Sequence, residues 1–509
     1  MVASPRPLLF HAVLCLAAGL SGLCGIRASD TGRPLQVATF FAEFMPGLRE
    51  TAAAYQAETG AGVRVQGIPY AMHPMWVRTQ FLSGSPPDVL ILEGTDLPWM
   101  YGQAGLLERC DRLLEEPNAW DARHPRWGDF FEPDLVQLSR DATGALWALP
   151  FTQYRVGFFY DRTAYARLGI REPDTWSGLV ENFRATTGSG LPAIAVAVKS
   201  NDAQSQWMGE LMLEFLLRPA AERVNLRHAE GWRFAADDPA SVRGEVIDLA
   251  ERIVAFERGL IDPAKSEAFA EVARLLAEFS KTWRPDFLSL DGEQIFTLFA
   301  GGRVAHFLNG TWYVRELREL QKAPGGAAGR PAFAWGVFPF PQLDTRATAL
   351  PLLGRMPQNA GMRACILMPK RSAGAAGRAG APEGGRRARV LRFVQYLTSP
   401  AVASRFFGEG DVYDPPALRD VSPRAELRAL LAPPPPAVLG MAHFNGYDAE
   451  STSEFWTAWQ RFLGGRVDRR GFLEELSGAQ RRALQRLAAR YLPDEDRAFV
   501  ERELGRKFQ

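Results

Sequence analysis

Apolar residues near the start of the chain follow first a strand-like and then a helix-like spacing. The run from Leu35 to Phe41 is apolar and β-rich, which predicts a strand. The next apolar residues recur at the i, i+4 and i+7 positions of one helix face, as Leu48, Ala52 and Tyr55. Gly60 is expected to end this helix, because glycine readily adopts the left-handed conformation of a helix C-cap.

The same alternation continues to residue 92. Val63 and Val65 alternate with polar residues as in a second strand, and a helical stretch bearing Met and Trp follows. Val89 to Leu92 is a continuous apolar run, which is typical of a buried parallel strand. The order strand, helix, strand, helix, strand predicts an α/β layer structure with right-handed crossovers.

Two loops follow the carboxyl ends of these strands, where α/β sheets hold their ligands. Phe41 and Glu43 follow the first strand, and Glu93 and Asp96 follow the third. We expect at least one of the two loops to contact a ligand. For Asp96 the alternative is a capping role at the start of the helix that begins near Leu97.

The stretch GGRVAHFLNGTW combines a turn, a buried strand and an aromatic residue. Val304 to Leu308 reads as the strand, and Asn-Gly ends it, so Trp312 lies just past a strand end. Its flat ring suits stacking on a sugar ring or a cation, and a core position is the alternative. His306 lies within the strand without a ligand-spaced partner, and we expect it to be structural.

Prolines in the middle of the chain mark two positions at which the chain is expected to cross from one domain to the other. Pro150 is expected to break one element before a strand starts at Val156 to Tyr160. The segment from Glu181 to Leu290 carries apolar stripes at helical spacing and is predicted to be largely helical. Phe338 to Pro341 forms a stiff, extended piece that marks the second candidate crossing.

The last part of the chain contains a loop, a spacer and a helix. Residues 371–389 are rich in Ala, Gly and Arg and are predicted to form a flexible, solvated loop. The run Pro433 to Pro436 reads as a rigid polyproline spacer. An amphipathic helix follows, with an apolar face of Phe455, Trp459, Phe462 and Leu463 and with Trp456 at its edge.

Length and charge narrow the function classes. The 509 residues predict two or three domains, given about 150 residues per domain. Lys and Arg total 59 against 58 for Asp and Glu, so the chain offers no electrostatic argument for nucleic acid. No CxxC, HExxH or Cys/His cluster with zinc spacing occurs, and we expect neither a metal nor a cofactor.

Residues 1–28 resemble a secretory signal peptide. Arg6 gives a short positive region, Leu8 to Leu20 an apolar region, and small residues lead to a cleavage point at Ala28. The apolar span is shorter than the about 20 residues that cross a bilayer. A lipid anchor on Cys24 would need a small residue before it, but Leu23 stands there, so lipid anchoring is the less favoured interpretation. After cleavage only Cys110 and Cys365 remain, and we favour free thiols over a disulfide.

An ordered set of motifs resembles the family 1 extracellular solute-binding proteins of ABC importers, the group that includes maltose-binding protein. The segments AYQAETGAGVRV and SGSPPDVLILEG resemble the family's early helix and the Pro-Asp-Val entry to its strand. WALPFTQYRVGFFYDRTAYARLGI resembles the passage across its first hinge. FTLFAGGRVAHFLNGTW and WGVFPFP resemble its Gly-x-Trp signature and the following strand, whereas LLGRMPQNAGM departs from the family pattern.

The resemblance implies a two-lobed α/β fold of the type II periplasmic-binding-protein kind, with a ligand cleft between the lobes. Residues 34–149 plus 342–412 would form lobe one, and residues 150–341 plus 413–509 would form lobe two. The chain would then capture a solute by closing the lobes around it. The implied partners are a small solute, expected to be a carbohydrate, and membrane permease subunits. We expect an exported, periplasmic monomer that performs no catalysis.

The resemblance and the strand ends together indicate the ligand contacts. Trp312 matches the tryptophan of the family signature, where stacking is the expected role. Trp456 matches a second aromatic position, with a core role as the alternative. The remaining candidates are Phe41, Glu43, Glu93 and Asp96 from lobe one, Tyr154 and Trp207 from lobe two, and the amides of Gln358 and Asn359.

Two alternative functions use the same fold. The first is a secreted, thiaminase-like enzyme with Cys110 as its nucleophile, although Cys110 lies in a Leu-rich stretch that reads as helical and structural. His124 is the only imidazole near it in sequence. The second is a sensor subunit for a membrane receptor, in which the partner differs and the cleft does not.

Overall fold

The computed structural model describes residues 33–94, 97–118, 120–140, 144–199, 204–228, 230–236, 238, 247–322, 333–370, 383–408, 412–431 and 439–508. Four sequence expectations therefore lie wholly or partly outside the described residues: the signal peptide, Asp96, the polyproline spacer, and residues 371–382 of the predicted loop. The rest of that loop, from Glu383, is the start of a helix and was wrongly predicted, because Arg386 is buried in an ion pair with Asp88 and the helix continues into buried apolar residues from Val390 onward.

The first apolar core gathers around a sheet whose first three strands are parallel, as predicted. β1 pairs in parallel with β2 on one side and with β3 on the other. The helix after β1 ends at Gly60, whose φ of 73° is the left-handed cap expected there. The elements are β1 (Leu35–Thr39), α1 (Met45–Thr59), β2 (Val63–Gly67), α2 (His73–Leu82), β3 (Val89–Glu93), α3 (Leu97–Gln103) and α4 (Pro133–Leu138).

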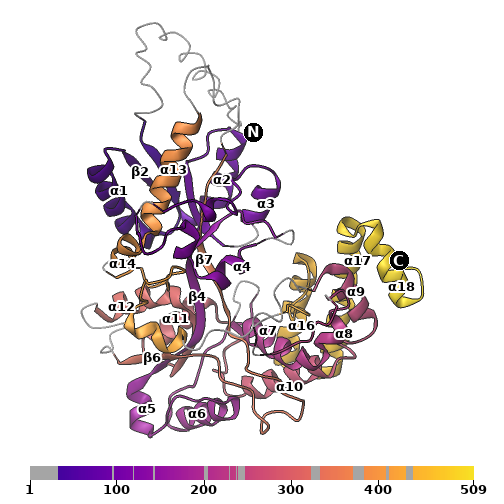
Figure 1. The fold of residues 1–509 in the computed structure, drawn as a ribbon. Helices are drawn as coiled ribbons and strands as arrows, with labels where there is room; N and C mark the ends of the chain where they lie inside the picture. Colours follow the sequence, from indigo (N-terminus) through magenta and orange to yellow (C-terminus); the bar gives the residue numbers. More distant parts are fainter. Residues whose placement is uncertain are drawn as a thin grey trace, which may run out of the picture.

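One long strand, β4 (Leu149–Asp161), joins the two parts of the molecule, and Figure 1 shows it running between them. The predicted break at Pro150 is wrong, because Pro150 lies inside β4, opposite Cys365. The strand accommodates it with a shift of register between Pro150 and Thr152, a bulge at which proline is tolerated in a sheet. β4 therefore carries the chain across without a loop.

The strands that pair with β4 are antiparallel to it. Its first half pairs with β7 (Ala360–Leu367), and its second half pairs with β5 (His306–Gly310) and β6 (Trp335–Phe338). The predicted strand at 304–308 is thus displaced by two residues toward the C-terminus. The strand order β2-β1-β3-β7-β4-β5 gives one continuous sheet, with β6 also on β4.

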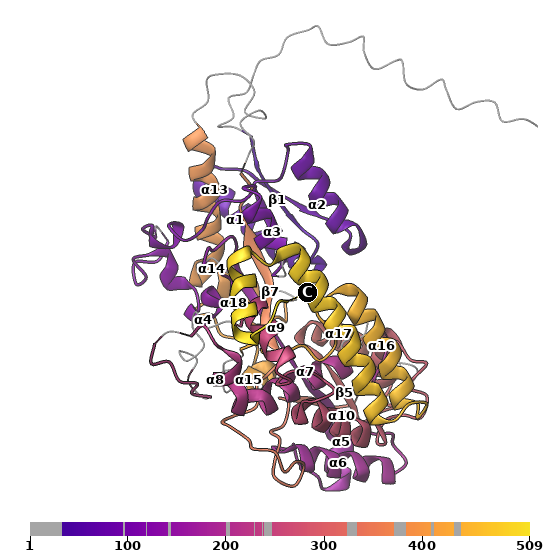
Figure 2. The ribbon, with the colours of Figure 1, turned by 90° about the vertical axis from the view of Figure 1, so that its right-hand side faces the viewer.

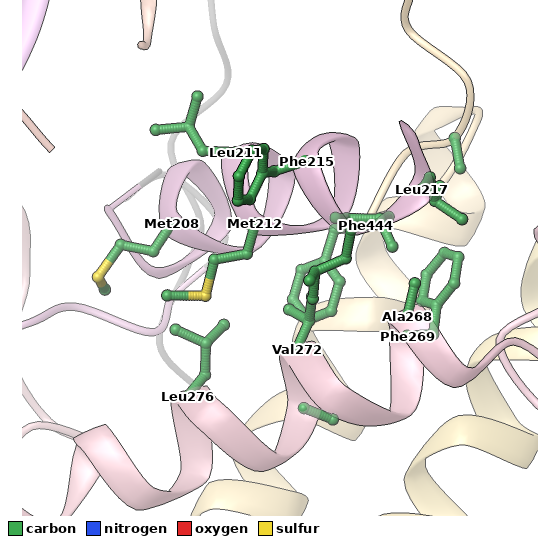
Figure 3. Close-up of a cluster of buried hydrophobic side chains, with 14 of the residues drawn as sticks. Met208, Leu211, Met212, Phe215, Leu217, Ala268, Phe269, Val272, Leu276 and Phe444 are labelled. Carbon is green, nitrogen blue, oxygen red and sulfur yellow. The ribbon is translucent and has the colours of Figure 1, made fainter. Parts of the chain in front are cut away.

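The second apolar core is mainly helical, as the spacing of its apolar residues predicted. Figure 3 shows α7 packed along α10, with Met212 above Leu276 and Phe444 inserted between the helices near Phe269. The helices of this region are α5 (Arg162–Leu168), α6 (Trp176–Gly188), α7 (Gln204–Leu217), α8 (Ala221–Val224), α9 (Leu249–Glu257), α10 (Glu267–Ser280), α11 (Gly292–Ala300) and α12 (Val314–Lys322).

The chain returns to the first core and then to the second. Figures 1 and 2 show α13 and α14 beside α1, and the C-terminal helices beside α7 to α10. Among the described residues, no helix combines the length and the apolar character that crossing a bilayer requires. These late helices are α13 (Glu383–Thr398), α14 (Pro400–Gly408), α15 (Arg428–Leu431), α16 (Ala449–Leu463), α17 (Arg469–Tyr491) and α18 (Asp494–Leu504).

The two cores divide the chain into two lobes. The first contains buried residues between positions 35 and 151 and between 364 and 421, and the second contains residues between 156 and 356 and between 439 and 500. A third cluster, around Phe307 and Val337, adjoins the second. We propose that the chain crosses between the lobes within residues 152–155 of β4, near the start of β7, and near residues 412–416.

Candidate functional site

Trp312 lies between the two lobes, at the point where β5 ends. The chain turns from β5 into a single 3₁₀ turn, Thr311–Tyr313, and then into α12. The indole ring folds back over Gly310, where an added Cβ would lie 2.0 Å from the ring. Only glycine therefore allows this ring position, which explains the Gly-x-Trp spacing of the motif.

Two aromatic residues of the second lobe meet the ring of Trp312 edge-on. The Tyr154 ring lies 5.7 Å from it at an interplanar angle of 71°, and the Trp207 ring lies 6.0 Å from it at 79°. Tyr154 is fixed by β4, and Trp207 by the first turns of α7. The three rings were predicted separately from the sequence, and the structure brings them together.

Arg363, a residue that the sequence reasoning missed, connects Trp312 to the first lobe. Its guanidinium carbon lies 5.6 Å from the ring centre of Trp312 and 5.2 Å from that of Phe41, within cation–π range. Its Nη2 donates a hydrogen bond of 2.9 Å to Oε1 of Glu43. The arginine therefore bridges the loop after β1 and the platform after β5.

Asp414 is the second residue that the sequence reasoning missed. Its carboxylate lies 2.6 Å from Nε of Arg363, and it accepts a hydrogen bond of 3.4 Å from the Thr311 hydroxyl. Burial raises the pKa of Asp414 to about 7, although Arg363 acts to lower it. Burial also acts to lower the pKa of Arg363, but Asp414 and Glu43 outweigh it and raise that pKa.

A small cavity, part of it open to solvent, lies beside Trp312. In this conformation its volume is about 10 Å³, room for about one water molecule, and its walls hold two aromatic and four charged residues: Glu43, Trp312, Arg315, Glu316, Tyr413 and Asp414. Glu43 belongs to the first lobe, and the other five come from the 3₁₀ turn after β5, the start of α12 and the crossing near residue 413. A ligand here would meet both lobes at once, together with hydrogen-bonding groups and flat apolar rings.

The predicted residues of the first lobe take different positions around this site. Glu43 lines the cavity. Burial acts to lower the pKa of Arg363, and Glu93, like Asp414 and Glu43, acts to raise it. Phe41 is only 2% exposed, because the Arg363 guanidinium and the rings of Phe40 and Phe44 cover it. Phe41 therefore supports Arg363 in this conformation and offers little surface to a ligand.

Three further candidates have contacts of their own that occupy or bury them in part. The side-chain amide of Gln358 is already engaged, because it accepts a hydrogen bond from Phe340 N and donates one to Phe340 O, each 3.0 Å long. Asn359 lies just before β7, and its backbone oxygen accepts from Val156 N. Trp456 is 3% exposed and packs edge-on against Phe455, so the structure places it in the core.

His306 has the structural role expected from the sequence. Its Nδ1 donates to the backbone oxygen of Ala193, and its Nε2 accepts from the Tyr165 hydroxyl, each at 2.8 Å. Burial lowers the pKa of His306 to about 3, so the ring is neutral at physiological pH. Within the described residues, no three His, Cys, Asp or Glu side chains are grouped to hold a metal ion.

Comparison with known proteins identifies relatives over most of the chain. A family model for bacterial extracellular solute-binding proteins matches residues 41–404. No curated protein matches the chain. Among solved structures, RafE in complex with raffinose shares 15% sequence identity, with a TM-score of 0.55 over 89% of this chain and 100% of that chain.

Two other solved structures have the same fold. A chitin oligosaccharide binding protein is 17% identical, with a TM-score of 0.54 over 89% of this chain and 99% of its own. The bacterial solute receptor AcbH, which prefers β-D-galactopyranose, is 12% identical, with a TM-score of 0.58 over 89% and 99% of the two chains. At these identities the likeness establishes the fold alone.

The structural matches confirm the two-lobed α/β fold that the motifs implied. The family model spans the strand-end loops, the first passage through β4 and the Trp312 motif, which are the segments that carried the resemblance. The chain therefore belongs to the family of bacterial extracellular solute-binding proteins.

Proposed function

We propose that this protein captures a neutral sugar or a related polyol between its two lobes. The observation that carries the proposal is the position of Trp312, which meets Tyr154 and Trp207 of its own lobe and, through Arg363, Glu43 of the other. Aromatic faces suit the apolar side of a sugar ring, and carboxylates and guanidinium groups suit its hydroxyls. Three proteins of the same fold bind raffinose, a chitin oligosaccharide or galactopyranose.

The charges around Arg363 favour a neutral ligand over an anionic one. Asp414, Glu43 and Glu93 all act to raise the pKa of Arg363, so three carboxylates already surround one guanidinium. The cavity wall holds one arginine, Arg315, against the three carboxylates of Glu43, Glu316 and Asp414, so a sugar phosphate or uronic acid would meet an excess of negative charge. We therefore expect neutral saccharides to bind more tightly than their anionic analogues.

Delivery to an ABC importer follows from the same proposal. A ligand stabilises the closed arrangement of the lobes only by contacts that it makes better there than in the open one. Glu43 and Trp312 are on opposite sides of the crossing segments, so a sugar that contacts both would favour closure. Permease subunits would then recognise the closed form of an exported protein.

The enzyme alternative depends on Cys110, which the structure places away from solvent. The helix expected around Cys110 is wrong, because the residue lies in a segment without regular secondary structure, where its amide donates to Leu146 O at 2.8 Å. The thiol is completely buried, and burial, together with Asp111 and Glu108, raises its pKa well above the usual range. A nucleophilic cysteine needs the opposite, an accessible thiol with a lowered pKa. We therefore propose a binding role without catalysis.

Alkylation distinguishes the two roles. Iodoacetamide should leave Cys110 unmodified in the folded protein and should modify both Cys110 and Cys365 after unfolding in urea. Cys365, which is also buried and unbridged, is the internal control, because burial raises its pKa to about 12. Fast labelling of Cys110 that a ligand suppresses would instead support an enzyme.

A thermal-shift screen tests the sugar proposal. The panel contains neutral mono-, di- and trisaccharides, polyols, sugar phosphates, thiamine and a polyamine. A ligand at 100 times its dissociation constant stabilises the folded state by about 2.7 kcal/mol, which gives a clear shift in melting temperature. The proposal requires that at least one neutral sugar or polyol shifts the melting temperature. A shift with thiamine or a polyamine alone would overturn it.

A further inference from the structure

Tyr70 is an exposed aromatic residue that the sequence analysis did not select. It begins the 3₁₀ turn Tyr70–Met72, which follows β2 and precedes α2, and 63% of its surface is exposed. Tyr491 (59% exposed) is the comparable exposed tyrosine, at the end of α17 in the other lobe. Singly exposed apolar residues are ordinary on protein surfaces, so the case for Tyr70 depends on its neighbours.

A chain of ring contacts joins Tyr70 to the Trp312 site. The Tyr70 ring lies 5.3 Å from Phe40, edge-on, and Phe40 lies 4.3 Å from Phe41. Arg363 then lies over Phe41 on one side and over Trp312 on the other. Tyr70 thus stands at the solvent end of a continuous row that starts in the second lobe.

The Tyr70 hydroxyl and Arg363 are both influenced by the carboxylate of Glu93. Glu93 is the main cause of a raised pKa for the Tyr70 hydroxyl, followed by burial, whereas Arg363 acts to lower it. Glu93 ends β3, and both the Tyr70 hydroxyl and Arg363 are within its electrostatic reach. An aromatic face with a carboxylate next to it is the pairing that holds a sugar ring by stacking and hydroxyl hydrogen bonds.

The turn that carries Tyr70 is held in place. Nδ1 of His73 donates a hydrogen bond of 2.7 Å to the backbone oxygen of Tyr70. The His73 ring also packs on Phe40, with 4.2 Å between ring centres. A ring fixed on a short, anchored turn loses little conformational freedom when a ligand stacks on it.

We propose that Tyr70 and Glu93 form a distal subsite that binds a second sugar ring of an oligosaccharide whose first ring lies at Trp312. This inference rests on the proposed sugar-binding function. It adds that the protein prefers an oligosaccharide to the corresponding monosaccharide, and that Tyr70 is the source of the preference. The neighbouring exposed methionines, Met72 and Met75, lie on the same edge but offer no stacking face.

The test measures affinities by isothermal titration calorimetry for two matched pairs of probes: D-galactose with raffinose, and N-acetylglucosamine with its β-1,4-linked trimer. In the pair that binds, the trisaccharide should bind more tightly than the monosaccharide to the wild-type protein. Tyr70→Ala should weaken trisaccharide binding by about tenfold, the size of one aromatic contact, and should leave monosaccharide binding unchanged. Tyr70→Phe, which keeps the ring, should retain most of the affinity.

Two controls keep the result specific. Tyr491→Ala removes an equally exposed tyrosine from the other lobe, and Met75→Ala removes an exposed apolar side chain from the same edge. Neither should change affinity for any probe. Equal losses for monosaccharide and trisaccharide in Tyr70→Ala, or no loss for either, would overturn the distal subsite while leaving the sugar site itself intact. If wild-type protein binds no saccharide of the thermal-shift panel, the proposed function fails first.

Discussion

The guanidinium of Arg363 and the carboxylate of Asp414 form an ion pair of 2.6 Å at the crossing between the lobes. Only 3% of the Asp414 side chain and 17% of the Arg363 side chain are exposed. Removing one partner of such a buried pair is expensive because the other charge stays buried without compensation. We expect Arg363→Met to lower the free energy of unfolding by about 3 kcal/mol, measured by urea denaturation.

A double-mutant cycle separates the pair from the packing of the arginine stem. Asp414→Asn alone and Arg363→Met alone should each destabilise the protein, and the double variant should be more stable than the sum of the two losses predicts. A coupling energy of about 1–3 kcal/mol is expected for groups in direct contact. Strict additivity would show that the two side chains contribute independently.

Asp414 should also make stability depend on pH. Its pKa is about 7 in the folded protein, whereas an aspartate in an unfolded chain has a pKa near 3.9. Between these values the folded state binds more protons than the unfolded state, so the contribution of Asp414 to the free energy of unfolding falls as pH rises. The slope in this window is up to about 1.4 kcal/mol per pH unit.

Urea denaturation between pH 4.5 and pH 8 tests the Asp414 assignment. Asp414→Asn removes the titrating group, so its stability relative to wild type should rise across this range. Asp448→Asn is the matched control, since hydrogen bonding to Arg486 lowers the pKa of Asp448 to about 2 and leaves it ionised throughout. A constant difference between wild type and Asp414→Asn would contradict the assignment.

Trp456 should behave as a core residue. It is buried against Phe455 on α16, so Trp456→Ala is expected to destabilise the protein by about 3–5 kcal/mol. Trp456→Phe should cost less and, in the folded protein, should leave sugar affinity unchanged. Melting temperature and calorimetric titration together make the test. A stable Trp456→Phe variant with greatly weakened binding would return this residue to the ligand site.

The sequence was informative where a local pattern decides local structure. The apolar run in β3 and the i, i+4, i+7 spacing in α1 predicted their elements, because each pattern reports directly which side chains are buried. Pro150 misled, since its effect depends on the bulge between β4 and β7, and no local signal reveals a bulge.

The centre of the candidate site could not be read in the same way. Arg363 and Glu43 are 320 positions apart in the chain, so only the fold brings them together. One signal was available in the sequence. Arg363 stands in the stretch GMRACILMP, where an arginine between residues of a buried strand requires a partner for its charge. That reasoning would have indicated a buried ion pair without naming Asp414.

The central claim is that Trp312 is the platform for a bound sugar. Calorimetric titration of wild type and Trp312→Ala, with the neutral sugar that gives the largest thermal shift, tests it most directly. Circular dichroism first establishes that the variant is folded. We predict a loss of at least about tenfold in affinity, since the ring is the shared contact of Tyr154, Trp207 and Arg363. Unchanged affinity in a folded Trp312→Ala variant would contradict the account.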